Sequence, residues 1–467
     1  MDAASPTFIG NTLTGNAAGG AVMAGSATAT LLSNTLTDNG FAGIGLKEQA
    51  RPLLEDNKIE NNRGYGVLIH GSSEAILQRC HVEGNQNSGI CASGLTSVTL
   101  FKCVVKGGSG NKRQRTGIQI QDEASMTAVD CTVTSHTGSN LFVRDRSSLK
   151  MQGGCISAAH GAGIVLQGSC KAVIHQASCI DNRVCNIITL DDASASAVRV
   201  ALSDSRGAGF IATGNSKVQL EGCNFTANSG TGLYGSTAAC IKATRCRFSG
   251  NGGAGISLEQ GSEGHISQSI FFENCCSSLH IEGSSVTAEI SGNLLLGATV
   301  PQQGSNQTGA ARRSGMGAGL AQNVTPSPDG DLDMADAESV DNEGFAISPE
   351  AEEGMEGSAL HLAAAPAPED SCQDAEGAEG GKLLLQNNII ESSSQSIAEQ
   401  NVLCEEGDRA RLIEWGLGQL ESMLQAPLPE LERADEMSDE TPDNSNNLNW
   451  KPAVLLEMPG GAICLGR

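Results

Sequence analysis

Apolar and polar residues alternate in short runs that recur at a fixed interval through residues 5–297. Starting from Asn11 and stepping by 23 residues, with one step of 28 between Cys103 and Cys131, every position reached is a small residue or an amide. Two positions further on lies an apolar column: Leu13, Leu36, Ile59, Val82, Val105, Val133, Ile156, Leu202, Phe225, Phe248, Phe271 and Leu294, with Cys179 as a weaker member. Alternation over so few residues predicts short strands, and the fixed interval predicts a repeat architecture.

Two further columns describe the rest of each repeat. Five residues past the starting position is an Asn column: Asn16, Asn39, Asn62, Asn85, Asn182, Asn228, Asn251 and Asn274. Nine residues past it is a column of Gly or Asn, which includes Gly43, Gly66, Asn140, Asn186 and Gly209. Because these residue types tolerate a left-handed backbone, we expect the second column to mark a bend. Stacked Asn side chains are expected to hydrogen-bond from one turn to the next.

A turn of this length cannot bury its own inward side chains, whereas stacked turns form a continuous core. The sequence therefore predicts an all-β fold, a right-handed parallel β-helix of about 12–13 turns, roughly 60 Å long at the spacing of parallel strands. The main rival is a leucine-rich repeat solenoid. It would need a denser Leu pattern and a helix in each repeat, and neither is present.

The chain divides into five predicted parts: a β-helix over 5–297, a disordered insertion over 298–381, a further β-helix turn over 382–404, an amphipathic cap helix over 405–425 and an irregular tail over 426–467. The insertion is rich in Ala, Gly, Pro and Ser, and from Ser314 to Gly381 it holds 16 acidic residues and no Lys or Arg. The proposed helix places Leu412, Ile413, Leu417, Leu420 and Leu424 near one face.

Two segments, "ATATLLSNTLTDNGFAGIGL" at 27–46 and "RPLLEDNKIENNRGYGVLI" at 51–69, carry a resemblance to known repeats. They resemble the right-handed β-helix repeats of the β-helical F-box-only proteins and of carbohydrate-binding and sugar-hydrolase β-helix domains. The first resemblance implies a module that holds the substrate protein of a ubiquitin ligase. However, "APLPELERADE" at 426–436 continues with acidic residues where an F-box would have an apolar helix, so no F-box is predicted.

Charge and cysteine content limit the partners and the cellular location that the sequence predicts. The formal net charge of −24 argues against nucleic acid as a main partner. The opening residues lack the features of a secretory leader, and no apolar run is long enough to predict a membrane span. The 16 Cys are therefore expected to be reduced core thiols of a cytoplasmic or nuclear protein. Since the repeat begins at about Ser5, we expect this chain to be a piece of a longer protein rather than one capped by a partner.

The extra residues between Cys103 and Cys131 form a basic loop, and they are the first candidate site. Lys106, Lys112, Arg113 and Arg115 stand out in an acidic protein and predict binding of an acidic peptide, a phosphate or an anionic sugar. The alternative is an ordinary solvated turn.

Asp181 and Asp204 form the second candidate site, because they occupy one column in adjacent turns. Stacked carboxylates repel, and one of them could have a raised pKa suited to acid–base catalysis. Asp191 and Asp192 lie nearby in the chain, but the aromatic platforms typical of sugar-binding grooves are scarce. His136 and His160 could approach on neighbouring turns, but two imidazoles make an incomplete metal site. We therefore predict no catalytic residues, no metal and no cofactor.

These patterns favour a non-catalytic scaffold for protein–protein interaction. The alternative is a β-helix that binds or modifies a carbohydrate.

Overall fold

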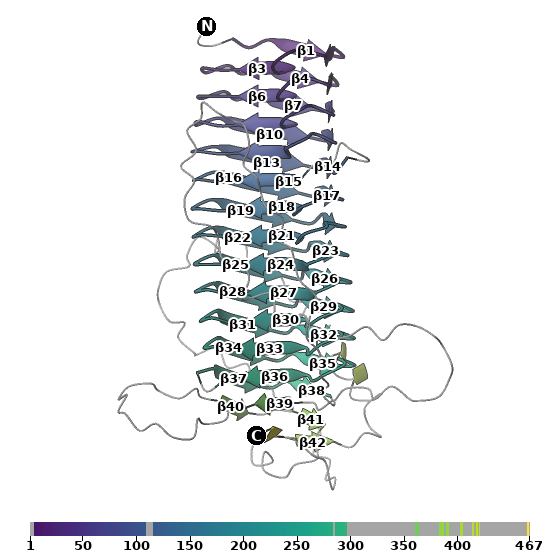
Figure 1. Cartoon of the computed structure of the whole chain (residues 1–467), viewed down its shortest axis with the longest axis vertical. Helices are drawn as coiled ribbons and strands as arrows, with labels where there is room; N and C mark the ends of the chain where they lie inside the picture. Colours follow the sequence, from purple (N-terminus) through teal and green to yellow (C-terminus); the bar gives the residue numbers. More distant parts are fainter. Residues whose placement is uncertain are drawn as a thin grey trace, which may run out of the picture.

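The computed structural model of the chain is a parallel β-solenoid in which nearly every turn contributes one strand to each of three sheets (Figure 1). The structure describes residues 4–108, 115–283 and 285–296, and the short segments 360–363, 383–386, 389–391, 402–404, 413–414, 417–418, 420 and 465–466. Partners in neighbouring strands, such as Leu36 and Ile59, are 23 residues apart. The predicted all-β parallel fold and its repeat length are therefore confirmed.

We call the first sheet, which begins with β1, sheet A. Its 14 strands, in spatial order, are β1 (Thr7–Ile9), β4 (Thr30–Leu32), β7 (Leu53–Glu55), β10 (Glu74–Gln78), β13 (Ser97–Phe101), β16 (Ser125–Val129), β19 (Ser148–Gln152), β22 (Lys171–His175), β25 (Ser194–Val198), β28 (Lys217–Glu221), β31 (Cys240–Thr244), β34 (Glu263–Ser267), β37 (Thr287–Ser291) and β40 (Leu383–Gln386).

Sheet B follows after a tight corner. Its 15 strands are β2 (Thr12–Thr14), β5 (Thr35–Thr37), β8 (Lys58–Glu60), β11 (His81–Glu83), β14 (Val104–Lys106), β17 (Thr132–Thr134), β20 (Cys155–Ser157), β23 (Ser178–Ile180), β26 (Ala201–Ser203), β29 (Asn224–Thr226), β32 (Arg247–Ser249), β35 (Ile270–Phe272), β38 (Leu294–Leu295), β41 (Ile389–Glu391) and β42 (Val402–Cys404).

Sheet C completes each turn. Its 14 strands are β3 (Ala21–Met23), β6 (Ile44–Leu46), β9 (Val67–Ile69), β12 (Ser88–Ala92), β15 (Thr116–Ile120), β18 (Leu141–Val143), β21 (Ile164–Leu166), β24 (Cys185–Thr189), β27 (Ala208–Ala212), β30 (Leu233–Gly235), β33 (Ile256–Glu259), β36 (Leu279–Glu282), β39 (Leu360–Ala363) and β43 (Leu465–Gly466).

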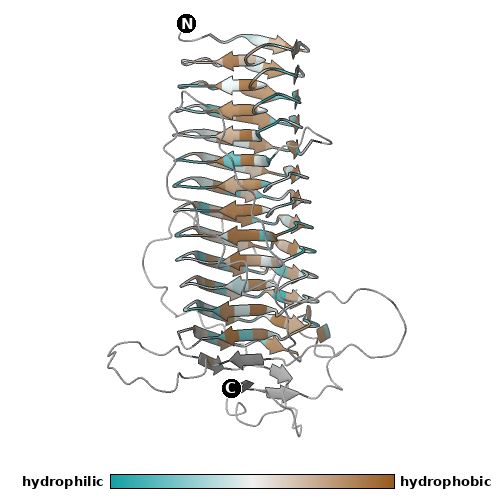
Figure 2. Cartoon of the chain, in the orientation of Figure 1, coloured by the Kyte–Doolittle hydropathy of each residue, from teal (hydrophilic) through white to brown (hydrophobic). Residues whose placement is uncertain are grey.

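The core lies inside the coil, where the predicted apolar column of sheet B meets inward side chains from sheets A and C. Strands are mainly hydrophobic, while polar residues gather in the turns between them (Figure 2). Towards the end of the coil the column becomes aromatic: Phe225, Phe248 and Phe271 stack with ring centroids 4.5 and 4.7 Å apart. At the first turn Phe8 pairs with the buried Leu31, yet it remains 42% exposed.

Asn side chains form ladders at the corners of the coil, as the sequence predicted. The Asn62 Oδ1 atom accepts hydrogen bonds from the backbone N–H of Asn39 at 3.1 Å and from its Nδ2 at 2.9 Å. The Asn62 Nδ2 atom donates to the carbonyl of Leu36 and to Asn85 Oδ1. Each buried amide thus satisfies backbone groups that the corner leaves without strand partners.

A second corner column, which starts at Asn11 and lies between sheets A and B, holds buried Cys residues at several positions where other turns have Asn. The thiol of Cys80 donates to the Leu54 carbonyl at 3.3 Å, and that of Cys223 donates to the Ala197 carbonyl at 3.3 Å. Asn57 makes the equivalent bond to Leu31 at 2.7 Å. Cys therefore serves both as a small apolar residue and as a weak donor. The predicted core location is confirmed for the thiols of this column, but it was wrong for Cys275, which is exposed, and Cys155, Cys240 and Cys276 are only partly buried.

The Gly column has a different cause from the one predicted. Gly43 and Gly66 are not among the residues with positive φ. A Cβ atom on Gly43 would instead lie 2.5 Å from Ile59 Cγ2, and 2.8 Å from both Asn62 Nδ2 and the Gly66 carbonyl oxygen. These glycines are required because the next turn fills the space with a core side chain, a backbone carbonyl and the Asn of the ladder, so the interpretation of this column as a left-handed bend was wrong.

The left-handed conformation occurs one residue before each of the two corner columns. Asp56 and Arg79 have φ of 53° and 49° at the first corner, and Asn61 has φ of 55° at the second. The last complete turn is also longer than predicted, since Glu263 pairs with Thr287, 24 residues away. As a result Asn293, not Gly292, receives the Ser269 N–H at 2.8 Å, and Leu295, not Leu294, pairs with Phe271.

The later segments continue the stack. Strands β40 and β41 pair with β37 and β38 within the predicted further turn at 382–404. Strand β39 lies inside the segment predicted as a disordered insertion, and β43 lies inside the predicted tail. The remaining residues of those two segments are outside the described part of the chain.

Part of the predicted cap helix is described, and it lies on the side of the coil. Residues 413–414, 417–418 and 420 are helical. Leu420, Ile413 and Leu417 pack against Ile270, Phe272, Leu294 and Leu296. The side chains of Ile270, Phe272 and Leu294 from sheet B point outward, because the alternate residues Phe271 and Leu295 belong to the core inside the coil. Leu412 and Leu424 are outside the described residues.

Candidate functional site

The outer face of sheet C carries an unusual run of residues along the solenoid axis. From β3 to β36, backbone pairing places these outward residues in one column: Val22, Gly45, Leu68, Cys91, Gln119, Phe142, Val165, Ile188, Ile211, Tyr234, Ser257 and His280. Five consecutive members, from Phe142 to Tyr234, are apolar or aromatic. We call these five residues the apolar stripe.

The apolar stripe forms a second hydrophobic cluster outside the coil. Val165, Ile211 and Tyr234 are 8%, 3% and 2% exposed, and they contact a border of apolar side chains from the adjoining turns. That border consists of Ala162, Val184, Cys185, Leu190 and Ala208. Phe142 and Ile188 are half-buried and leave part of their surface accessible.

The stripe ends at a polar cluster formed by Glu259, His280 and Glu282, which we call the sheet C cluster. One ligand-type atom from each residue lies within 4.8 Å of the other two. Glu259 of β33 pairs with Glu282 of β36, so the two carboxylates project from adjacent strands. The His280 Nε2 atom is 3.3 Å from Glu282 Oε2.

Two buried hydroxyls hold the carboxylate of Glu259. The Tyr234 hydroxyl donates to Glu259 Oε2 at 3.0 Å, and the Ser257 hydroxyl donates to Oε1 at 3.0 Å. Burial, together with the charge of Glu259, raises the pKa of Tyr234 well above its ordinary value. The tyrosine therefore remains a neutral donor, and it links the apolar stripe to the sheet C cluster.

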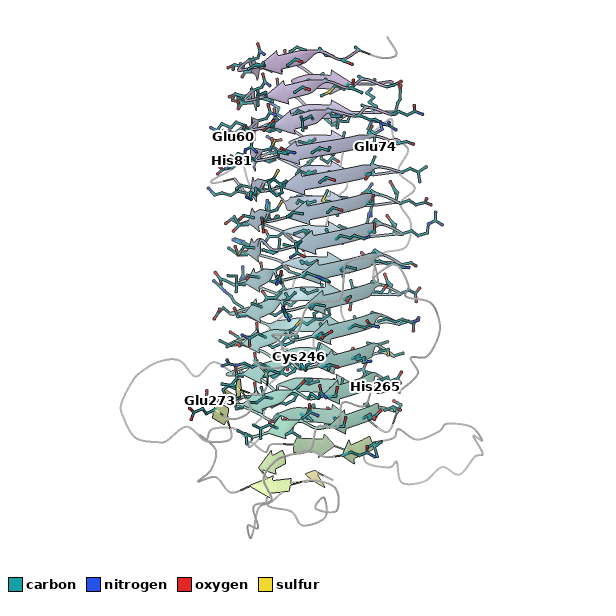
Figure 3. The ribbon with its side chains drawn as sticks, turned by 180° about the vertical axis from the view of Figure 1, so that it is seen from behind. Glu60, Glu74, His81, Cys246, His265 and Glu273 are labelled. Atoms are coloured by element: carbon teal, nitrogen blue, oxygen red, sulfur yellow. The ribbon has the colours of Figure 1, made fainter. Side chains whose placement is uncertain are left out.

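A cluster of the same composition lies on the outer face of sheet B: Glu60, His81 and Glu83, the sheet B cluster. His81 Nε2 is 2.9 Å from Glu83 Oε2 and 3.7 Å from Glu60 Oε1. Figure 3 shows Glu60 and His81 on successive turns at the outside of the coil. Here each carboxylate also meets a lysine, with Lys58 Nζ 2.8 Å from Glu60 and Lys106 Nζ 3.0 Å from Glu83.

The lysines change the electrostatics of the sheet B cluster. Burial opposes ionisation of Glu83, but hydrogen bonds from His81 and Lys106 outweigh it and lower the pKa of that carboxyl. The hydrogen bond to Glu60 raises the pKa of Lys58. Two carboxylates and two ammonium groups thus form an ion-pair network across three strands.

A third imidazole on sheet A is bonded differently. His265 Nδ1 is 3.3 Å from Glu289 and Nε2 is 3.0 Å from Glu263, so the carboxylates lie at opposite ring nitrogens. This arrangement satisfies the imidazole by hydrogen bonds. It does not direct the three groups towards one point.

The predicted basic loop is described only at its ends. Lys106 ends β14 and pairs with Glu83, so it belongs to the sheet B cluster. Arg115 is exposed just before β15, and its carbonyl accepts a hydrogen bond from Gly138 N–H at 2.7 Å. Lys112 and Arg113 lie outside the described residues, and binding by this loop stays a prediction.

Asp181 and Asp204 occupy equivalent corners of adjacent turns, as the spacing predicted. Both are exposed, with φ of 53° and 55°. Asp is among the few non-Gly residues that adopt this conformation readily, so the backbone alone gives a reason for both residues. A catalytic role for the pair stays untested.

His136 and His160 lie on successive turns, where the His160 N–H donates to the His136 carbonyl at 2.9 Å. The His136 side chain is fully buried in the Asn ladder column, and its Nδ1 is 2.6 Å from Asn140 Oδ1. His160 is exposed. One side chain points into the corner and the other towards solvent, so the two do not form the contact considered from the sequence.

The sequence prediction missed both His–Glu clusters, because it considered contacts between pairs of histidines and not between histidines and acidic residues. A pattern was nevertheless present. In each cluster a His is followed two residues later by Glu, and another Glu lies 23 residues before that Glu, as in His81 and Glu83 with Glu60. Combining the repeat length with strand alternation would have located both clusters.

Comparison with known families gives one result that covers most of the coil. The family described as "Right handed beta helix region" matches residues 1–156 and 139–295. No curated protein matches the chain. Within the described residues, no helix is long and apolar enough to cross a membrane.

Proposed function

The chain belongs to the right-handed β-helix family, and from that premise we propose that it is a non-catalytic scaffold that binds an apolar segment of a partner protein. The binding surface is the outer face of sheet C. The apolar stripe is the observation that carries the proposal, because outward columns of a sheet ordinarily hold polar residues, and Phe142 and Ile188 of this column keep accessible apolar surface.

Comparison with sheet A at the same turns supports this choice of face. Its outward residues there are Thr127, Lys150, Val173, Ser196 and Gln219. Four of these five are polar, whereas all five residues of the stripe are apolar or aromatic. At these five turns the outward column of sheet C is therefore apolar where the matching column of sheet A is mostly polar.

The form of the stripe fits a contact with another chain. Phe142 and Ile188 keep accessible surface, and Val165 and Ile211 are fixed by the border of apolar residues. Fixed apolar and aromatic side chains suit a binding surface because little side-chain entropy is lost on association. No ionisable side chain occurs within the stripe apart from the hydrogen-bonded Tyr234, which favours binding over catalysis.

The resemblance to the β-helical F-box-only proteins supports a more specific form of the proposal. In that form the bound partner is a substrate of a ubiquitin-ligase-type assembly, and the β-helix is its recognition module. Removing the chain from cells should then lower ubiquitination of the captured partner. Unchanged ubiquitination would leave the scaffold proposal standing without the ligase.

A photo-crosslinking amino acid at position 188, in the stripe, tests the scaffold directly. The matched control carries the same amino acid at position 99, where Thr99 is exposed on the outer face of sheet A. We expect crosslinks from position 188 to an apolar segment of one partner protein, lost when Phe142 is replaced by Glu. Equal crosslinking from both positions would contradict the proposal.

Two other outcomes would relocate the function. Loss of the partner only in a variant with Ala at Lys112, Arg113 and Arg115 would assign binding to the basic loop. Retention on a glycan array, together with no protein partner, would favour the carbohydrate-binding alternative and direct attention to Asp181 and Asp204.

A further inference from the structure

We propose that Glu259, His280 and Glu282 form a binding site for a divalent transition-metal ion of the zinc class. The site has three protein ligands, and water would complete its coordination. The inference does not depend on the proposed protein binding, since it rests on a separate group of side chains.

The geometry of the ligand atoms supports a common ion. Zinc bonds to imidazole nitrogen and carboxylate oxygen at about 2.0–2.2 Å, so tetrahedral ligand atoms lie roughly 3.3 Å apart. His280 Nε2 and Glu282 Oε2 are 3.3 Å apart, and the third carboxylate is within 4.8 Å of both. Small side-chain rotations would bring all three atoms to one centre without moving the strands.

Support around the ligands is the second observation. Glu259 accepts hydrogen bonds from the Tyr234 and Ser257 hydroxyls, and both of these residues are at least nine-tenths buried. Hydrogen bonds of this kind orient the ligands of metal sites and raise affinity. The carboxylate is thus held in place by the sheet before an ion arrives.

Charge gives the third observation. Glu259 and Glu282 are directly opposite each other on paired strands, where like charges destabilise a sheet. Among the described residues, no Lys or Arg pairs with either carboxylate. The sheet B cluster has the same three residue types, but Lys58 and Lys106 compensate its carboxylates. A cation at the sheet C cluster would supply the compensation that lysines supply on sheet B.

The class of ion follows from the donors. Imidazole nitrogen favours zinc and neighbouring transition metals, whereas calcium and magnesium prefer sites made only of oxygen atoms. Two carboxylates and one imidazole leave room for water at zinc, the arrangement usual where an ion keeps an open position.

The test uses the full chain, stripped with a chelator and titrated with Co²⁺ in excess Mg²⁺, which occupies exposed carboxylates. Co²⁺ reports its ligands by visible absorption, and thiolate ligands would add intense charge-transfer bands. We expect one Co²⁺ site per chain without thiolate bands, displaced by Zn²⁺. His280→Ala should weaken binding at least tenfold, and Ser257→Ala should weaken it by about tenfold.

His81→Ala is the matched control, because it removes the equivalent imidazole from the sheet B cluster. It should bind Co²⁺ as the wild type does. Glu282→Gln provides a second test, since this side chain is 55% exposed and its loss should not affect folding. The proposal is overturned by wild-type affinity in both His280→Ala and Glu282→Gln, by equal loss in His81→Ala, by dominant thiolate bands, or by binding of Ca²⁺ without Co²⁺.

Discussion

The Asn ladder of the second corner is continuous in some turns and interrupted in others. From Asn16 to Asn85 each turn provides an Asn, and each amide bonds to the next. In the middle of the coil the same column holds Ala159 and Ser205, which cannot bridge neighbouring turns.

An Asn from the neighbouring column bridges each of these two interruptions. Asn140 donates across the turn of Ala159 to Asn182 Oδ1 at 3.2 Å, and Asn186 donates across the turn of Ser205 to Asn228 Oδ1 at 3.3 Å. At Gly43, Gly163, Gly209, Gly232 and Gly255 this neighbouring column is Gly, because the Asn of the following turn lies close to where a Cβ atom would be; at Gly117 the side chain of His136 takes that place. At this corner, the ladder amide can therefore come from either of two columns of the repeat, and the other column then holds a small residue.

The largest expected effect comes from the core that both regions share. Ile59 lies beneath the continuous ladder and Ile156 beneath the interrupted one, and both are 0% exposed. Replacing either by Asp buries an unpaired charge, which should cost more than about 4 kcal/mol in the free energy of unfolding. Thermal melting checks this. An unchanged melting temperature in either variant would contradict the shared core.

The substitution Gly43→Asn tests whether the Gly column and the Asn ladder compete for the same space. A Cβ at this position would meet Ile59 Cγ2 at 2.5 Å, and Asn62 Nδ2 and the Gly66 carbonyl each at 2.8 Å, so we expect a loss of about 3 kcal/mol. Adding Asn62→Ala recreates the pairing seen at Asn140 and Ala159, and it should recover at least half of that loss. Chemical denaturation of the single and double variants measures the coupling. Additive effects would mean that the two columns do not share one space.

His136→Asn restores a ladder residue in the interrupted region, and its effect depends on pH. Burial lowers the pKa of His136 to about 4, from an ordinary value of 6.5, and its Nε2 has no hydrogen-bond partner. Between these values the unfolded chain binds more protons than the folded one, so stability falls as the pH drops from 6.5 towards 4. At pH 5 the penalty is about 2 kcal/mol.

The variant should remove that penalty and leave stability near pH 8 less affected. Urea denaturation at pH 5 and at pH 8 measures the difference. An equal pH dependence in the wild type and His136→Asn would show that other groups, such as the buried His175, cause the acid sensitivity.

A structural feature could be predicted when it produces a regular pattern in the sequence. Strands, repeat length and the Asn ladder leave a strict period, so all three were predicted. A Gly column also leaves a period, but Gly can serve either left-handed φ or close approach, and only the position of Asn62 against Gly43 decides between them. The extra residue before Thr287 shifted the last register because nothing in its composition marks it.

The candidate site was harder to predict from the sequence than the fold, for a physical reason. The apolar stripe consists of outward residues one turn apart, and residues such as Ile188 look like core positions until the strand alternation is fixed. The His–Glu clusters depend on contacts between adjacent strands, in which His280 and Glu259 are 21 residues apart. Such pairs become visible only when the repeat is wound into turns.

The direction of the backbone hydrogen bonds has a mechanical consequence. They run from turn to turn along the solenoid axis, so tension applied between the two ends loads one layer of bonds at a time. The chain would lengthen in steps, each releasing 23 residues, or roughly 80 Å of extended polypeptide. The turn in which Val105 and Val133 are paired 28 residues apart would give the longest step, and the 24-residue turn between Glu263 and Thr287 a slightly longer one than the rest. The increase in length at each step, measured on a single stretched molecule, would therefore report the number of residues in each turn.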